Sequence, residues 1–150
     1  MRGFSLIELL VALAILAIAT AVALPIYNAY SVRAERTGIQ ADLLRCAQGM
    51  ERHANVAMDY EGAVDTDGDG AGDASTGLVS RNICAVDSRA YTVTVHAADA
   101  VRFVLRARAV HADSPVGRDG MLELDSRGAR RWDRNNDGDF DDDGETGWQP

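Results

Sequence analysis

The sequence RGFSLIELLVALAIL, residues Arg2 to Leu16, opens an apolar run that contains a single acidic side chain, Glu8. The run continues to Ile26 without a further charge, so that the segment from Phe4 to Ile26 contains 23 residues. At about 1.5 Å of rise per residue they make a helix of about 35 Å, which is enough to cross the roughly 30 Å hydrocarbon core of a bilayer. We therefore predict that this segment spans a membrane.

Glu8 is costly in such a segment. A carboxylate inside a membrane span costs roughly 2.5 kcal/mol or more, so we expect Glu8 to have a partner and a function. A cleaved secretory signal peptide is the competing interpretation, but its apolar region is only about 7–15 residues long. Here the cationic leader is Arg2 alone, and no small-residue cleavage site with a polar exit follows the run. A membrane anchor explains the segment better than a signal peptide does.

The motif Gly3-Phe4-Ser5-Leu6-Ile7-Glu8, between a short basic leader and an apolar helix, resembles the N-terminus of type IV pilins and of type II secretion pseudopilins. The resemblance implies cleavage by a prepilin peptidase between Gly3 and Phe4, followed by N-methylation of Phe4. It also implies that Glu8 meets the charged N-terminus of a neighbouring subunit. Because an unpaired buried charge is expensive, such an ion pair would set the register of assembly.

The same resemblance implies an organisation for the whole chain. Residues 1–3 would be the leader, residues 4–30 the transmembrane and assembly segment, and residues 31–150 a soluble head that includes the second half of the helix. Proline removes a backbone hydrogen bond, so Pro25 is expected to kink or locally melt the helix near Ala21–Pro25, as an assembly feature. The precursor would lie in the bacterial inner membrane with a periplasmic head and would later join an extracellular filament, or fimbrium. Expected partners are other pilin subunits, the prepilin peptidase, the inner-membrane assembly platform and, before assembly, membrane lipid.

Beyond the membrane segment, apolar residues recur every three or four positions on a helix that reaches Ala57. They form one stripe on a water-soluble helix, which we expect to face the core: Ile39, Leu43, Cys46, Met50, Ala54 and Ala57. Alternating patterns predict strands at residues 91–95, 101–110, 121–124 and 129–132. A long N-terminal helix packed on a small antiparallel sheet of three or four strands is an α+β architecture and is the fold that the pilin resemblance implies.

The two cysteines, Cys46 and Cys84, are too few for a disulfide scaffold and lack the spacing of a zinc site. Cys46 lies on the apolar stripe and should point into the head. In a periplasmic or external compartment a disulfide with Cys84 is chemically permitted, and we predict this pair in preference to two free thiols. Many pilins instead carry a cysteine pair around a C-terminal loop, and its absence here weakens any transfer of that loop's adhesive role.

Two acidic loops hold much of the charge of a chain whose formal net charge is −8. Residues 65–73 place acids at loop positions 1, 3, 5 and 9 and glycine at position 6, as at the start of an EF-hand calcium loop, and residues 133–141 place oxygen ligands at the same positions. Neither loop has a glutamate at position 12 or flanking helices, and a solvated polar turn is the alternative. We predict calcium as a cofactor, with these candidate ligands: Asp65, Asp67, Asp69 and Asp73, and Asp133, Asn135, Asp137, Asp139, Asp141 and Glu145.

Arginines gather on one face of the predicted strand at residues 101–110, at Arg102, Arg106 and Arg108. Such a face can bind DNA phosphates. A solvated strand face is the more frequent cause, and no stacking aromatic residues interleave with the arginines, so DNA is not expected as a partner. The three histidines lie in separate segments without a nucleophile or metal-ligand spacing, and we expect no enzyme.

The expected function is a structural subunit, minor or major, of a bacterial type IV pilus, supporting twitching motility, adhesion or DNA uptake. A PilE-type minor pilin is the nearest sort, on the resemblance of Arg33-Ala34-Glu35, Glu51-Arg52 and the strand-turn-strand of residues 122–132. Two alternatives stay open. One is a calcium-binding pseudopilin of type II secretion, whose major form has a similar acidic loop before a tryptophan, here Trp148. The other is a membrane-tethered adhesin or DNA-binding module that does not polymerise.

Overall fold

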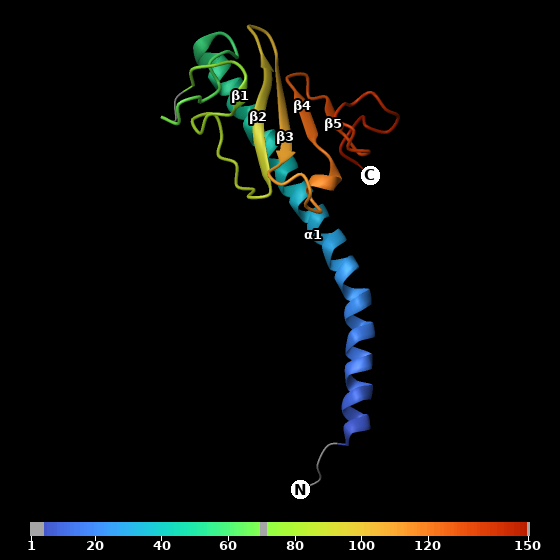
Figure 1. Ribbon diagram of the computed structural model, residues 1–150. Coiled ribbons are helices and arrows are strands. Elements are labelled where there is room, and N and C mark those ends of the chain that lie inside the picture. The colour runs from blue at the N-terminus through green and yellow to red at the C-terminus, as the bar shows by residue number, and fades with distance from the viewer. Residues whose placement is uncertain (1–4, 70–71, 150) are drawn as a thin grey trace. The chain divides into compact units, whose positions relative to one another are not determined.

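The computed structural model describes residues 5–69 and 72–149 (Figure 1). The chain divides between Ala34 and Glu35 into two compact units, which are described separately below. A single helix, α1 (Leu6–Ala57), contributes its first part to the N-terminal unit and its second part to the head. The predicted boundary at residues 30 and 31 lies a few residues before this division.

The N-terminal unit is the apolar part of α1. By length and composition it is able to cross a membrane, and its large side chains, such as Leu6 and Ile7, are exposed. Pro25 lies inside a continuous helix, so the single chain shows no interruption near Ala21–Pro25, and the expected kink or local melting on packing into a filament stays a prediction. Proline removes only one backbone hydrogen bond, and the surrounding turns keep theirs. Gly3 and Phe4 lie outside the described residues.

The head contains a five-stranded antiparallel sheet in the order β1-β2-β3-β4-β5. Its strands are β1 (Gly77–Leu78), β2 (Tyr91–Ala98), β3 (Phe103–Ala109), β4 (Leu122–Asp125) and β5 (Arg130–Trp132), with a short 3-10 helix η1 (Gly117–Asp119) between β3 and β4. The predicted α+β fold is confirmed. The additional strand is β1, whose two residues carry no alternating pattern.

One face of the sheet packs on α1 to form the core (Figure 1). The predicted stripe is fully buried at Ile39, Leu43, Cys46 and Met50, and it packs with alternate residues of β2, β3 and β4. Ala57, predicted on the same face, is exposed, because the buried part of the stripe ends at Met50 before the last turns of the helix.

A disulfide joins α1 to the connection that precedes β2. The predicted pair Cys46 and Cys84 is present, with a distance of 5.0 Å between the two Cα atoms. One turn away, Gly49 lets the helix approach the backbone of the same connection, since a Cβ atom there would lie 2.1 Å from the carbonyl oxygen of Ile83. The helix and the connection are therefore held together both covalently and by close packing.

Candidate functional site

The second acidic loop, residues 133–145, brings three predicted ligands together. One carboxylate oxygen from each of Asp133, Asp137 and Glu145 lies within 4.8 Å of the other two. Asp133 directly follows β5, and the main-chain N–H of Trp132 donates to the carbonyl oxygen of Glu145 at 3.0 Å. The end of β5 therefore fixes both ends of the loop.

Two of these three carboxylates are removed from water. Asp133 is 1% exposed and Glu145 2% exposed, and in the part of the chain that the structure describes neither forms an ion pair. Asp133 accepts hydrogen bonds from the main-chain N–H groups of Asp137 and Gly138, each at 3.1 Å. Glu145 accepts hydrogen bonds from the main-chain N–H groups of Arg134 at 3.2 Å and of Asp142 at 3.4 Å. Backbone dipoles alone offset the buried charge.

The other predicted ligands of this loop lie outside the triad. Asn135 donates to Asp137 at 2.8 Å and to Asp142 at 2.6 Å. Asp139 and Asp141 form their own pair: a hydrogen bond from Asp141 lowers the pKa of Asp139, and the same contact with the negative Asp139 raises the pKa of Asp141. Spacing correctly predicts a cluster of oxygens here but not which of them converge.

The first acidic loop is more open. Oxygens of Asp65, Asp67 and Asp69 lie within 4.8 Å of one another, and Asp67 and Asp69 are exposed. The fourth predicted ligand, Asp73, instead accepts hydrogen bonds from Thr66, from the main-chain N–H at 3.1 Å and from the hydroxyl at 2.5 Å. This loop therefore offers three convergent carboxylates with access to water.

Oxygen-only sets of this kind suit a hard divalent cation such as calcium, which accepts six to eight oxygen ligands. The second loop fits the requirement better, because Asp133 and Glu145 are buried and form no ion pair with a cationic side chain among the described residues. Burying ionised carboxylates is expensive unless a charge partner is present. The residues of the second loop thus fit a calcium ion.

The predicted arginine face is largely neutralised where it crosses the sheet. Register places Arg106, Glu123 and Arg131 side by side on β3, β4 and β5. Glu123 is 2% exposed and binds both guanidinium groups, at 2.7 Å from Arg106 and 2.5 Å from Arg131. Near the start of the hairpin, Arg102 pairs with Asp99 at 2.8 Å. Only Arg108 of this face is exposed without a carboxylate partner among the described residues.

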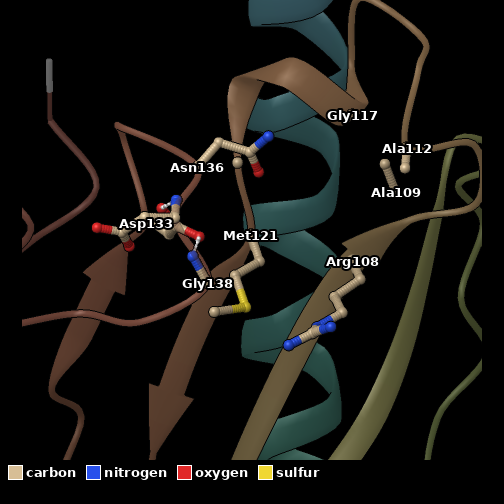
Figure 2. Close-up of a pocket in the computed structure, with 10 residues that line it drawn as sticks. Arg108, Ala109, Ala112, Gly117, Met121, Asp133, Asn136 and Gly138 are labelled. Carbon is tan, nitrogen blue, oxygen red and sulfur yellow. Dashed lines mark hydrogen bonds between the residues drawn. The ribbon is translucent and has the colours of Figure 1, made fainter.

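Arg108 lies beside a cavity of about 270 Å³ between the β3–β4 connection and the second acidic loop (Figure 2). His96 lies on the adjacent strand β2. Its pKa is lowered, first by partial burial and then by the positive charges of Arg106 and Arg108. Gly120 and Asp133 are in close backbone contact at the cavity, since a Cβ atom on Gly120 would lie 1.6 Å from the carbonyl oxygen of Asp133. The sequence prediction did not include this cavity, which forms only when residues 112–120 and 133–138 meet.

Glu8, the predicted assembly residue, lies in the first turn of α1 at the other end of the chain. Glu8 is exposed on α1, and its carboxylate accepts a hydrogen bond from the main-chain N–H of Ser5 at 3.0 Å. A carboxylate in the first turn also interacts favourably with the helix dipole. The charge of Glu8 is thus satisfied locally while it stays accessible to a neighbouring subunit.

Comparison with known families identifies what the chain is. Residues 1–24 match the prokaryotic N-terminal methylation motif, and residues 25–118 match the family described as type IV minor pilin ComP, DNA uptake sequence receptor. The chain belongs to this minor pilin family. No curated protein and no solved structure matches it.

The family places this minor pilin as a structural subunit of a type IV pilus, which assembles with other pilins into a filament. Its N-terminal signal motif and apolar helix anchor it in the inner membrane before assembly. Because the match is to a pilin family, it favours a pilus subunit over a pseudopilin of type II secretion. It also favours a minor over a major subunit, which sequence patterns alone leave open.

Proposed function

We propose that this minor pilin binds DNA through the arginines of its head. The observation that carries the proposal is the match over residues 25–118 to a family described as a DNA uptake sequence receptor. The sequence patterns ranked DNA low because no aromatic residues interleave with the arginines. That argument applies to stacking on single strands, whereas duplex DNA is bound mainly through its phosphates.

The head presents guanidinium groups that are available to phosphates. Eight arginines are exposed and form no ion pair within residues 5–69 and 72–149. They come from the helix, the connections and the turns of the head: Arg52, Arg81, Arg89, Arg108, Arg118, Arg127, Arg130 and Arg134. Each arginine that contacts a phosphate releases counterions and makes the affinity depend on salt.

Direct binding tests the proposal. The full chain in detergent micelles is titrated into a fluorescein-labelled 24-base-pair duplex, and anisotropy is recorded between 50 and 300 mM NaCl. We expect binding whose logarithm falls linearly with the logarithm of salt concentration, with a slope of roughly −0.9 for each phosphate contacted. Absence of binding at 50 mM NaCl would contradict the proposal.

We also propose that the second acidic loop binds calcium, with Asp133, Asp137 and Glu145 as ligands. Its support is the pair of buried carboxylates without a cationic side chain. A second support is electrostatic. Residues 35–150 carry 13 arginines and 22 acids, a formal charge of −9, and eleven of these acids lie in the two loops. A head with that charge repels DNA unless cations reduce the charge of the loops.

Calorimetry and melting test the calcium proposal. We expect heat on titration of calcium into the full chain, a higher melting temperature with 1 mM calcium than with a chelator, and tighter binding of the duplex with calcium. No heat together with an unchanged melting temperature would exclude the site. Magnesium at the same concentration is the control for a general effect of divalent charge.

A third proposal concerns how the precursor is cleaved and how the subunit is inserted into the filament. A prepilin peptidase would cleave between Gly3 and Phe4, and an inner-membrane platform would insert the subunit by pairing Glu8 with the amine of a neighbour. We assign the chain a structural role and no catalysis. Glu8→Ala should abolish incorporation into pili, and Glu8→Asp should restore part of it. Normal incorporation of the alanine variant, or loss of exoprotein secretion with normal pili on deletion of the gene, would favour the alternatives.

A further inference from the structure

The cavity beside the second acidic loop has walls of mixed chemistry (Figure 2). Arg108 comes from β3 and Asn136 from the acidic loop, and Met121 lies between them in this view. Ala109 and Met121 make apolar parts of the wall, and the carboxylate of Asp137 adds an acceptor. The cavity of about 270 Å³ is smaller than most ligand pockets, which occupy roughly 300–1,000 Å³, and it suits one small planar group.

Two polar side chains that line the cavity are free to bind a ligand. Within the described residues, neither the guanidinium of Arg108 nor the side-chain amide of Asn136 has a hydrogen-bond partner, and both residues are exposed. Arg108 offers donors only, whereas Asn136 offers a donor and an acceptor. Asn136 has a φ of 59°, a left-handed conformation that the turn of the loop requires. The cavity therefore presents donors and acceptors together.

The combination of hydrogen-bond donors and acceptors in the cavity distinguishes a base edge from a phosphate as its partner in DNA. A phosphate has only acceptor oxygens, so it accepts from Arg108 and from the amide N–H of Asn136 but leaves the acceptor oxygen of Asn136 without a donor. The edge of a base carries amino donors beside ring or carbonyl acceptors. Arginine pairs with guanine, asparagine with adenine, an aspartate carboxylate accepts from the amino group of cytosine, and alanine contacts the methyl group of thymine. The donors of Arg108 and the combined donor and acceptor of Asn136 therefore match a base edge better than a phosphate.

We infer that this cavity reads the edge of a DNA base, with Arg108 and Asn136 as the residues that determine sequence preference. The inference rests on the proposed DNA binding and names what one part of that surface contacts. The exposed arginines elsewhere would contact phosphates and supply affinity, and the cavity would supply discrimination. The base could be paired and read in the major groove, or unpaired and inserted, because both present the same edge.

The test is selection and sequencing of bound DNA. The full chain in detergent, with 1 mM calcium, is incubated with one pool of duplexes carrying 12 random base pairs and one pool of random single strands. Arg108→Ala and Asn136→Gly are compared with the wild type. Glycine adopts a φ of 59° freely, so Asn136→Gly removes the amide without straining the loop. Arg127→Ala, an exposed arginine on the β4–β5 turn, is the matched control.

We expect the wild type to enrich a sequence motif, and each cavity variant to lose its preference at one position by roughly 5- to 150-fold. Arg127→Ala should weaken binding evenly over all sequences and keep the motif. Enrichment from the duplex pool indicates reading in the groove, and enrichment from the single-stranded pool indicates an unpaired base; either supports the inference. Thermal melting with and without calcium checks that both variants keep the fold and the loop.

Three outcomes separate the two proposals. If the wild type binds neither pool, the proposed DNA binding fails and the inference fails with it. If it binds DNA without enriching any motif, DNA binding stands and the inference is overturned. If it enriches a motif that Arg108→Ala and Asn136→Gly both keep, the discrimination lies elsewhere on the head and the inference is likewise overturned.

Discussion

The two acidic loops have the same spacing of oxygen ligands at positions 1, 3, 5 and 9 but opposite surroundings. In the first loop Asp67 and Asp69 are exposed, while in the second Asp133 and Glu145 are almost completely buried. Repulsion between exposed acids is screened by water and salt, whereas a buried anion must find dipoles or a cation. The spacing of the ligands therefore predicts which oxygens lie close together. Their burial determines the free-energy cost of bringing the charges together.

The largest effect on stability should come from the disulfide. It encloses the first acidic loop but not the second. Cys46 and Cys84 are 38 residues apart, so replacing both by alanine should cost about 4 kcal/mol of unfolding free energy through the freedom gained by the unfolded chain. Urea denaturation of the full chain in detergent measures this cost. Calcium stabilisation should survive in the variant, because the second loop lies outside the disulfide. A lost calcium response would show that the loops are not independent.

Local patterns account for most of the fold. The four-three-four spacing at Ile39, Leu43, Cys46 and Met50 correctly predicts the buried face of α1, and alternation predicts four of the five strands. Glu123 shows where such reasoning ends. Its place between Leu122 and Leu124 predicts an exposed side chain, yet it is buried. The cause is the register of three strands, which sets Arg106 and Arg131 on either side of it.

The candidate site was less predictable for a related reason. The sequence pattern indicates that residues 133–145 gather oxygens, but the burial of Asp133 and Glu145 depends on how the loop folds back on the sheet. Trp148 holds it there: its indole N–H lies 3.3 Å from the carbonyl oxygen of Glu123 and 3.1 Å from that of Arg131. These are contacts between distant parts of the chain, and no local pattern encodes them.

The next largest effect should separate one aspartate of each loop, Asp133 at position 1 of the second loop and Asp67 at position 3 of the first. Asp133→Ala removes the acceptor of two main-chain N–H groups in a buried place, and we expect it to cost about 2–3 kcal/mol in calcium-free buffer. Asp67→Ala, in an exposed place, should cost less than about 0.5 kcal/mol. Urea denaturation of both variants checks the difference. Equal costs would mean that burial does not distinguish the loops.

Calcium should act unequally on the two loops. If 1 mM calcium is 10 to 100 times the dissociation constant of the second loop, it stabilises the wild type by about 1.4–2.7 kcal/mol. Glu145→Gln keeps the shape of the side chain but removes its charge, and it should abolish most of this gain. Asp69→Asn, the matched change in the first loop, should leave most of it. The reverse pattern would assign the response to the first loop.

The smallest effect concerns an aromatic contact that the second loop makes with the sheet. Phe140 lies with its ring 5.5 Å from the guanidinium carbon of Arg106, which also binds Glu123. Phe140→Ala should cost about 0.5–1 kcal/mol, because the site is partly exposed and a cation–π contact there is weak. A double-mutant cycle with Arg106→Lys isolates the coupling between the two side chains. A coupling of zero would leave Trp148 and the end of β5 as the attachments of the loop, and the calcium response of Phe140→Ala would then equal that of the wild type.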